Sequence, residues 1–136
     1  SYKKRIMADT VSLLTTSVFS NSATLTGDKV KGDAYFGQSD GLHTIMIDVT
    51  DFIGTIKIQG SLELEPGADF FDIELGIDDF TVDTSGLVTK ISTESLVFNL
   101  AETSKKSYNA VGNFVWLRAD ISNWTAGTVN SIEMNR

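Results

Sequence analysis

The sequence predicts an all-β protein, an antiparallel β-sandwich of the jelly-roll kind with about eight strands. Apolar and polar residues alternate with a period of two, turn-forming clusters separate the alternating runs, and helical periodicity is weak throughout. Regularly spaced strands without intervening helices favour a sandwich over a parallel α/β sheet. The 136 residues are enough for one domain with a single hydrophobic core.

The first half of the chain contains three alternating runs, at residues 30–36, 43–49 and 54–65. The last of these is the longest, and one face of a strand there would be buried and the other solvated. Its apolar face is formed by Ile56, Ile58, Leu62 and Leu64. The preceding Ser/Thr-rich segment, residues 12–26, alternates poorly, so we expect either an edge strand or an arm that packs on a partner.

The second half continues the alternation from Phe71 to Val82, with a change of parity at Asp78 and Asp79. One extra residue restores the face, so a β-bulge or a short turn is expected there. Three further strands are predicted at residues 94–100, 111–121 and 128–134. The best helical candidate, residues 100–106, would be a single short turn. Turn-like clusters lie at residues 26–28, 38–41, 65–69, 84–86 and 125–127.

Composition narrows the function classes. Hydrophobic residues make up 41% and charged residues 21% of the chain, which is typical of a folded globular protein. Without cysteine there is neither a disulfide nor a thiolate site. The net charge of -7 argues against nucleic acid as a partner, and no run approaches the ~20 apolar residues that span a membrane.

The charge is distributed unevenly. Lys3, Lys4 and Arg5 form a basic tip, which we assign to an N-terminal arm of residues 1–10 ahead of a domain at residues 11–136. Residues 63–83 carry eight acids and no base. The basic arm either docks on an acidic neighbour or is a solvated terminus. Ser1 is what removal of an initiator Met leaves, and no signal-peptide segment follows, so we expect a nearly complete chain without a leader.

No catalytic residue, cofactor or metal site is predicted. The single histidine, His43, stands at the head of a strand, where a structural role is expected, and no nucleophile, phosphate-binding, dinucleotide or zinc motif occurs. Oxygen ligands for Ca²⁺ are available on Asp69, Asp72, Asp78, Asp79 and Asp83, but their spacing is not that of an EF-hand. The glycosylation sequon at Asn123 is interpreted as accidental.

Two groups of residues in the last third are candidates for binding. Phe114, Trp116 and Arg118 are predicted on one strand face opposite Val115, Leu117 and Ala119, so both faces carry bulk. An aromatic and Arg cluster is typical of a protein interface, although the chain's own N-terminal arm would bury it equally well. Trp124 is predicted in a loop, where it either stacks on a sugar with Tyr108, Asn109 and Asn113 or packs into the core.

Two parts of the chain together resemble modules of virion structural proteins from tailed marine bacteriophages. The first part begins at residues 31–37 and continues through 40–44 and 52–62 to 69–71. The second comprises residues 108–118 and 125–132. The resemblance spans residues 30–135. The same pattern is similar to galactose-binding-like jelly rolls. Where the phage modules carry a Trp, this chain has Phe70 and Phe71, so a Trp-based site there is in doubt.

The resemblance implies a non-enzymatic virion protein that decorates the capsid or is attached to the neck, tail or baseplate. Its partners would then be other virion proteins, and its location the virion after assembly in the host cytoplasm. We also expect a homo-oligomer, because virion parts sit on symmetry axes and edge strands need to be paired or covered. The alternative is a carbohydrate-binding module for attachment to the host surface, with glycan as its ligand.

Overall fold

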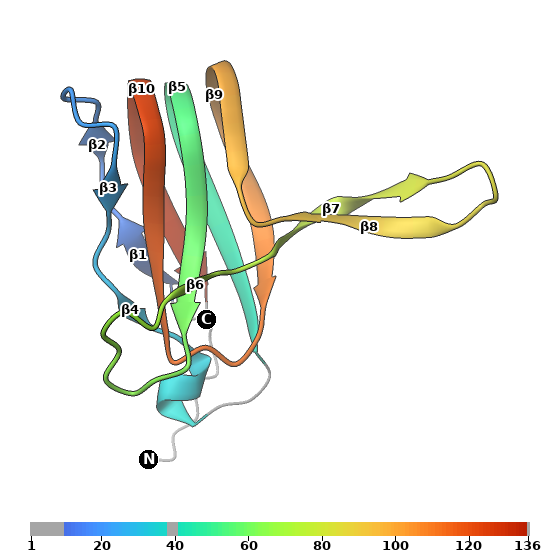
Figure 1. Ribbon diagram of the computed structural model, residues 1–136, viewed down its shortest axis with the longest axis horizontal. Helices are drawn as coiled ribbons and strands as arrows, with labels where there is room; N and C mark the ends of the chain where they lie inside the picture. Colours follow the sequence, from blue (N-terminus) through green and yellow to red (C-terminus); the bar gives the residue numbers. More distant parts are fainter. Residues whose placement is uncertain (1–9, 38–40, 136) are drawn as a thin grey trace.

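The computed structural model describes residues 10–37 and 41–135, which form ten strands and one short 3₁₀ helix (Figure 1). All strand pairs are antiparallel, and the path through the sheet is β1-β10-β5-β9-β7-β8. Strands β2, β3 and β4 pair with β10, and β6 pairs with β5. The all-β antiparallel prediction is confirmed, with ten strands in place of about eight.

The elements, in chain order, are β1 (Thr10–Leu14), β2 (Ser17–Val18), β3 (Leu25–Thr26), β4 (Val30–Lys31), η1 (Asp33–Phe36), β5 (Leu42–Ser61), β6 (Phe71–Asp72), β7 (Leu75–Val82), β8 (Val88–Thr93), β9 (Leu96–Val111) and β10 (Trp116–Asn135). Three of them are long: β5 and β10 have 20 residues each and β9 has 16. The runs predicted at residues 43–49 and 54–65 are therefore largely one strand, as are those at 111–121 and 128–134 beyond Val115.

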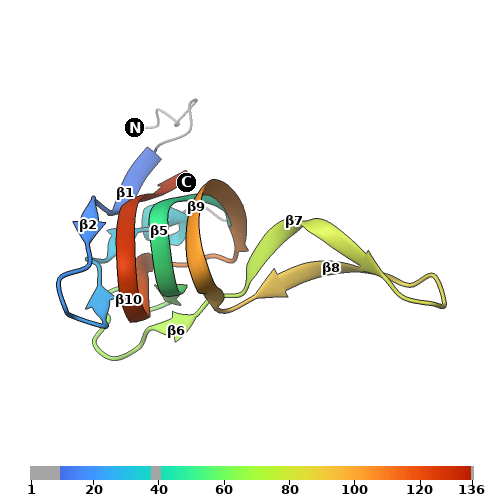
Figure 2. The same cartoon turned by 90° about the horizontal axis from the view of Figure 1, so that it is seen from above.

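The long strands bend together. Their pairing registers shift between Val49 and Gly54 in β5 and between Ser122 and Ser131 in β10. Backbone in the left-handed region lies at the same level, with φ of 49° at Asp51 and 50° at Asn123. Bulges bend a strand and increase its twist. Figures 1 and 2 show β10, β5 and β9 curving over together, so that two halves of the same strands form the two layers of a sandwich-like fold.

The hydrophobic core lies on the inner face of this bent sheet. Ile45, Ile47 and Val49 before the bend and Ile56 and Ile58 after it are all fully buried in one cluster. The predicted apolar face of the strand at residues 54–65 is thus half right. Leu62 and Leu64 are exposed, because β5 ends at Ser61 and the chain leaves the sheet as a loop.

The N-terminal segment covers one edge of the sheet. Its four short strands pair in turn with β10, from Thr10 opposite Asn135 to Lys31 opposite Trp116. Leu13 reaches the core. The segment predicted as either an edge strand or a partner-binding arm is thus an interrupted edge strand, and short edge strands are one way in which proteins protect a sheet edge.

Three predicted local structures are wrong. The run at residues 30–36 is a strand only at Val30–Lys31; η1 follows, closed by Gly37 with a φ of 75°, and it leaves Phe36 exposed. The helical turn expected at residues 100–106 lies inside β9. The turn expected at residues 125–127 lies inside β10, where Gly127 takes part in the bend. Local composition does not reveal a bulge in a long strand.

The hairpin formed by β7 and β8, Leu75 to Thr93, projects from the body of the molecule (Figures 1 and 2). We call it the arm. Its turn lies at the predicted cluster of residues 84–86, and its register shifts between Gly76 and Phe80, where a bulge was predicted. Only its base pairs with the body, through Leu75 and Gly76 opposite Ala110 and Asn109 of β9.

Candidate functional site

Trp116, one of the predicted interface residues, lies half-buried on the outer face of β10. Its indole Nε1 donates a hydrogen bond of 3.0 Å to the carbonyl oxygen of Leu64. The ring of Tyr35 meets it edge-on at 5.2 Å between centroids, and Lys29 Nζ lies 4.7 Å from the centroid of the indole ring. The loop after β5 and the segment around η1 therefore occupy much of the Trp116 surface.

Arg118 points to the same outer face and is also held by the chain itself. Its guanidinium lies 3.9 Å over the ring of Phe70, and its Nε donates a 2.9 Å hydrogen bond to Gln59 Oε1. Gln59 Nε2 in turn donates to Asp72, which also pairs with Lys57 at 3.1 Å. The Gln59 hydrogen bond, aided by Lys57, holds the pKa of the Asp72 carboxyl below its usual range against the effect of burial.

Phe114 does not share the face of Trp116 and Arg118, contrary to the prediction. It precedes the first residue of β10 and is buried, with its ring against Gly60 and Gly112. A Cβ at Gly60 would lie 2.8 Å from the Phe114 ring. The ring therefore fits only because Gly60 and Gly112 have no side chains. Val111 was expected to begin the strand at residues 111–121, but it ends β9 and is 70% exposed.

Trp124 lies within β10 and not in a loop. It is 3% exposed and packs with Phe52 and Phe19 at ring-centroid distances of 6.0 Å each. Its Nε1 donates to the carbonyl oxygen of Ala126. The indole thus fills the inside of the bend, where it is not available to stack on a sugar.

The other residues of the predicted sugar-binding loop do not converge on Trp124. Tyr108 is buried in β9 opposite Ile45, Asn109 is half-buried opposite Thr44, and Asn113 lies exposed in the connection from β9 to β10. Trp124 lies at the bend, between the residues of β10 that pair with Thr55 and Ile53. The structure therefore does not bring these four side chains to one surface.

His43 is fully buried in β5. Its Nε2 accepts a long hydrogen bond of 3.4 Å from the backbone N–H of Asp33, itself 1% exposed, and its ring lies 6.0 Å from that of Phe114. Nδ1 has no hydrogen-bond partner among the residues that the structure describes. Full burial fits the structural role expected for this histidine.

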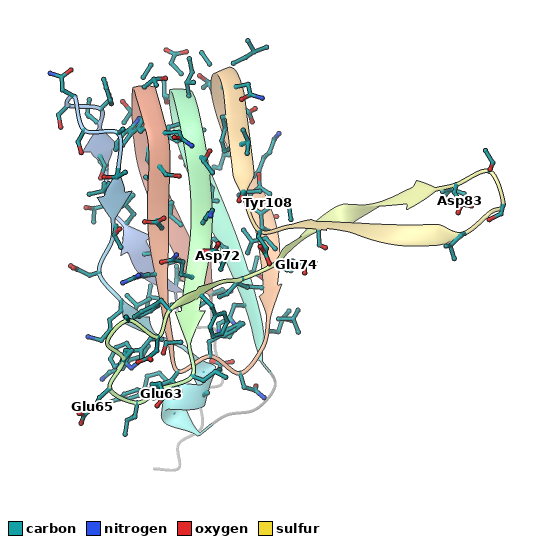
Figure 3. All side chains as sticks on the ribbon, viewed as in Figure 1. Glu63, Glu65, Asp72, Glu74, Asp83 and Tyr108 are labelled. Carbon is teal, nitrogen blue, oxygen red and sulfur yellow. The ribbon has the colours of Figure 1, made fainter. Side chains whose placement is uncertain are left out.

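Three of the acidic residues considered for calcium, Asp69, Asp72 and Asp83, lie apart, whereas the side chains of Asp78 and Asp79 are outside the described part of the structure. Asp69 accepts a hydrogen bond from the Gly67 N–H in the loop after β5, Asp72 lies against Lys57, and Asp83 lies at the far end of the arm (Figure 3). Among the side chains that the structure describes, no group of three His, Asp or Glu residues is arranged to hold a metal ion. No helix within residues 10–37 and 41–135 is long and apolar enough to span a bilayer.

The tip of the arm is ordered by Asp83. Its Oδ1 accepts hydrogen bonds from the Ser85 N–H, the Ser85 hydroxyl and the Leu87 N–H, at 2.7–2.9 Å. These bonds, that of Ser85 above all, hold the pKa of the Asp83 carboxyl below its usual range. Around this turn Val82, Leu87 and Val88 are between 58% and 64% exposed. The tip therefore presents apolar side chains on a preformed turn.

The outer side of β9 is a second unusual surface. Strand β9 pairs with β5 along its length, but on its other side the only described partner is β7, at Asn109 and Ala110. We call the stretch from residue 97 to residue 107 on that side the open edge. Leu100 is 82% and Val97 58% exposed there. A hollow lined by residues of β9, β5 and β10, among them Val97, Thr55 and Asn123, lies on the other side of Val97, over the face of the sheet.

Comparison with known proteins adds no assignment. No protein-family model matches the chain, and neither the curated proteins nor the solved structures give a significant match. The predicted interface residues Lys3, Lys4 and Arg5 lie outside the described residues. The arm and the open edge were not recognised in the sequence, although the turn at residues 84–86 between two alternating runs is a hairpin signal.

Proposed function

We propose that this chain is a non-enzymatic structural protein of a bacteriophage virion, where it decorates the capsid or is attached to the neck, tail or baseplate. The main support for a role in assembly is the projecting arm. Only its base pairs with the body, and its ordered tip presents three exposed apolar side chains. The virion as the setting is supported by the sequence resemblance.

A projecting hairpin of this kind is suited to a macromolecular partner. Exposed apolar side chains gathered at one place mark interaction surfaces, and a preformed turn lowers the entropy lost on binding. Val82, Leu87 and Val88 are the apolar side chains that such a partner would bury. In the virion the partner would be another virion protein or a further copy of the chain.

No observation favours the alternative, a carbohydrate-binding module for host attachment. Sugar recognition uses an exposed aromatic face, whereas Trp124 and Tyr108 are buried and point into different parts of the core. Among the half-buried rings, Tyr35 and Trp116 meet edge-to-face, and Arg118 lies over the ring of Phe70. The two more exposed rings, Phe36 at 46% and Phe71 at 43%, lie on different elements, η1 and β6.

The proposal is tested by the copy number of the protein in purified particles, measured by quantitative mass spectrometry on virions from the source that encodes the chain. Hundreds of copies per particle would support capsid decoration, and a few to tens would support the neck, tail or baseplate. Complete absence of the protein from particles would overturn the virion proposal.

The basic N-terminal arm is tested separately. A chain without residues 1–9 should fold, because the core cluster of the described residues begins at Leu13. If the basic residues dock on an acidic neighbour, the truncated chain attaches to particles less strongly than the full chain. Full occupancy of particles by the truncated form would refute docking by the basic N-terminal residues.

A further inference from the structure

We propose that the arm of one copy adds to the open edge of β9 in a second copy, so that the chain assembles with itself by strand addition. The inference rests on the proposed assembly function and names the partner and the acceptor surface. Both halves of such a contact are present on the same chain and are left unused within the described part of it.

The backbone supplies the first argument. β8 pairs with β7 on one side only, and β9 lacks a described partner along residues 97–107. Unpaired strand edges carry free N–H and C=O groups, and an added strand satisfies both sets at once. The six residues of β8 fit within this open stretch.

Exposed apolar side chains supply the second argument. Leu100 and Val97 on the open edge face solvent, as do Leu87 and Val88 on the arm. The hollow that Val97 and Asn99 line extends over β5 to Asn123 of β10, so only a side chain of the added strand on that face of the sheet would reach it. Strand addition of this kind combines main-chain hydrogen bonds, which give affinity, with pockets, which give specificity.

Charge supplies the third argument. Between Leu75 and Thr93 the arm carries Asp78, Asp79 and Asp83 against Lys90, a net charge of -2, whereas β9 carries Lys105 and Lys106 against Glu102, a net charge of +1. Glu102 is already paired with Lys106 at 3.2 Å, and Lys105 is exposed. β9 would therefore attract the acidic residues of the arm, which lie on β7 and at the tip.

The contact is tested by disulfide trapping between single-cysteine variants, since the chain has no cysteine of its own. Val88→Cys in one copy and Leu100→Cys in the other should form a mixed disulfide dimer on mild oxidation. The matched control replaces Leu100→Cys by Val18→Cys, which is 63% exposed on β2 along the covered edge, and should give no mixed dimer above background. Equal trapping with both partners would overturn the proposal.

A second measurement follows the unmodified contact in solution. The wild-type chain should self-associate at concentrations up to ~100 µM, and Leu100→Glu, which places a negative charge before the acidic arm, should weaken association by ~10-fold or more. Val18→Glu is the control with the same change of charge and should associate as the wild type does. A wild-type chain that stays monomeric throughout this range contradicts the inference.

The arm itself is removed in a third variant. Residues 77–91 are replaced by Asn-Gly, a dipeptide that forms tight turns between paired strands. The new turn joins Gly76 to Ser92, which face each other across the hairpin. This variant should stay folded, become monomeric and lose amide-exchange protection at residues 97–107. An oligomer that persists in this deletion variant would overturn addition of the arm and indicate that two β9 edges pair directly. Disulfide dimers of Leu100→Cys with itself, without mixed dimers with Val88→Cys, would indicate the same.

These outcomes are independent of the virion proposal. Self-association is measured on purified protein, whereas the place of the protein in a virion is measured by copy number in particles. A chain present in particles but monomeric in solution would refute strand addition alone. A self-associating chain absent from particles would refute the virion proposal alone.

Discussion

Gly127 lies where β10 passes closest to the bend of β5. It has a φ of 90°, in the left-handed region that favours glycine, and a Cβ there would lie 2.1 Å from the carbonyl oxygen of Asp51. Neither the strain nor the collision can be relieved by a side-chain movement, because the obstructing atoms belong to the backbone. The bend therefore depends on this one glycine.

Gly127→Ala is expected to destabilise the fold by more than ~2 kcal/mol, through left-handed strain added to a backbone clash. Urea denaturation followed by tryptophan fluorescence gives the change in the free energy of unfolding. The matched control is Gly67→Ala in an exposed loop, where a Cβ meets nothing within 4 Å. Equal stability of the two variants would mean that the bend does not have the conformation described.

Tyr108 shows what burial in β9 does to an ionisable group. Burial raises the pKa of the Tyr108 phenol, with Lys106 lowering it and Glu102 raising it by smaller amounts. A phenol that is harder to ionise in the folded state binds its proton more tightly there than in the unfolded chain. Its contribution to stability is thus retained below the unfolded pKa of about 10 and is lost as the pH rises above it.

Tyr108→Phe should therefore lose less stability than the wild type as the pH rises above about 10. The measurement is the free energy of unfolding in urea at a series of pH values. At pH 7 both proteins carry a neutral ring, so the comparison there shows what the substitution itself costs. Parallel pH profiles for the two proteins would contradict a raised pKa at this position.

At the scale of elements, the sequence predicted where several strands lie, but it did not predict where a strand bends or ends. Alternation located β5 on both sides of its bend, because each half obeys the period of two that burial of one face imposes. It did not show that the halves are one strand, since a bulge and a turn have similar composition. Likewise Leu62 alternates correctly with Ile58, yet it lies beyond Ser61, where pairing stops.

The ring of Trp124 supports the bend of the long strands from inside. Trp124→Ala should cost ~3–5 kcal/mol by leaving a cavity against Phe52 and Phe19, and Trp124→Phe should cost less because it keeps a ring there. Differential scanning calorimetry of the two variants compares them. Loss of glycan binding in Trp124→Ala would carry no information unless the variant is shown to be folded.

The candidate interface was only partly readable from the sequence. Trp116 and Arg118 were placed on one outward face because they are two residues apart, and the structure agrees. Their contacts with Tyr35, Leu64 and Phe70 join segments distant in sequence, and no local pattern reports such contacts. Phe114 was misplaced because the strand begins only at Trp116.

At the scale of the whole molecule, the first described residues pair with the last. Strands β1 to β4 lie along β10, so that Thr10 is opposite Asn135 and Lys31 is opposite Trp116. The sheet cannot be completed until both ends of the chain are present. Pairing of such distant segments requires a large loss of chain entropy before the contacts form.

Refolding from urea is therefore expected on the millisecond-to-second timescale typical of all-β domains of high contact order, and not in ~100 µs or less. Stopped-flow tryptophan fluorescence measures it, since Trp124 and Trp116 both become buried or half-buried on folding. A chain that lacks residues 1–31, and with them β1 to β4, should fail to reach the native state. Native-like refolding of this truncated chain would contradict a requirement for these four strands.

The sequence by itself determined the all-β class, the inward positions of the long alternating runs and the turn at the tip of the arm. Each of these depends on residues close together in the chain, through side-chain alternation or turn chemistry. Only the tertiary structure decided that β5, β9 and β10 bend into two layers, that Trp124 lies inside the bend, and that β7 and β8 project while β9 keeps an open edge. The physical reason is that burial and edge pairing depend on which distant segment lies opposite a residue, and alternation is the same whether or not such a segment is there.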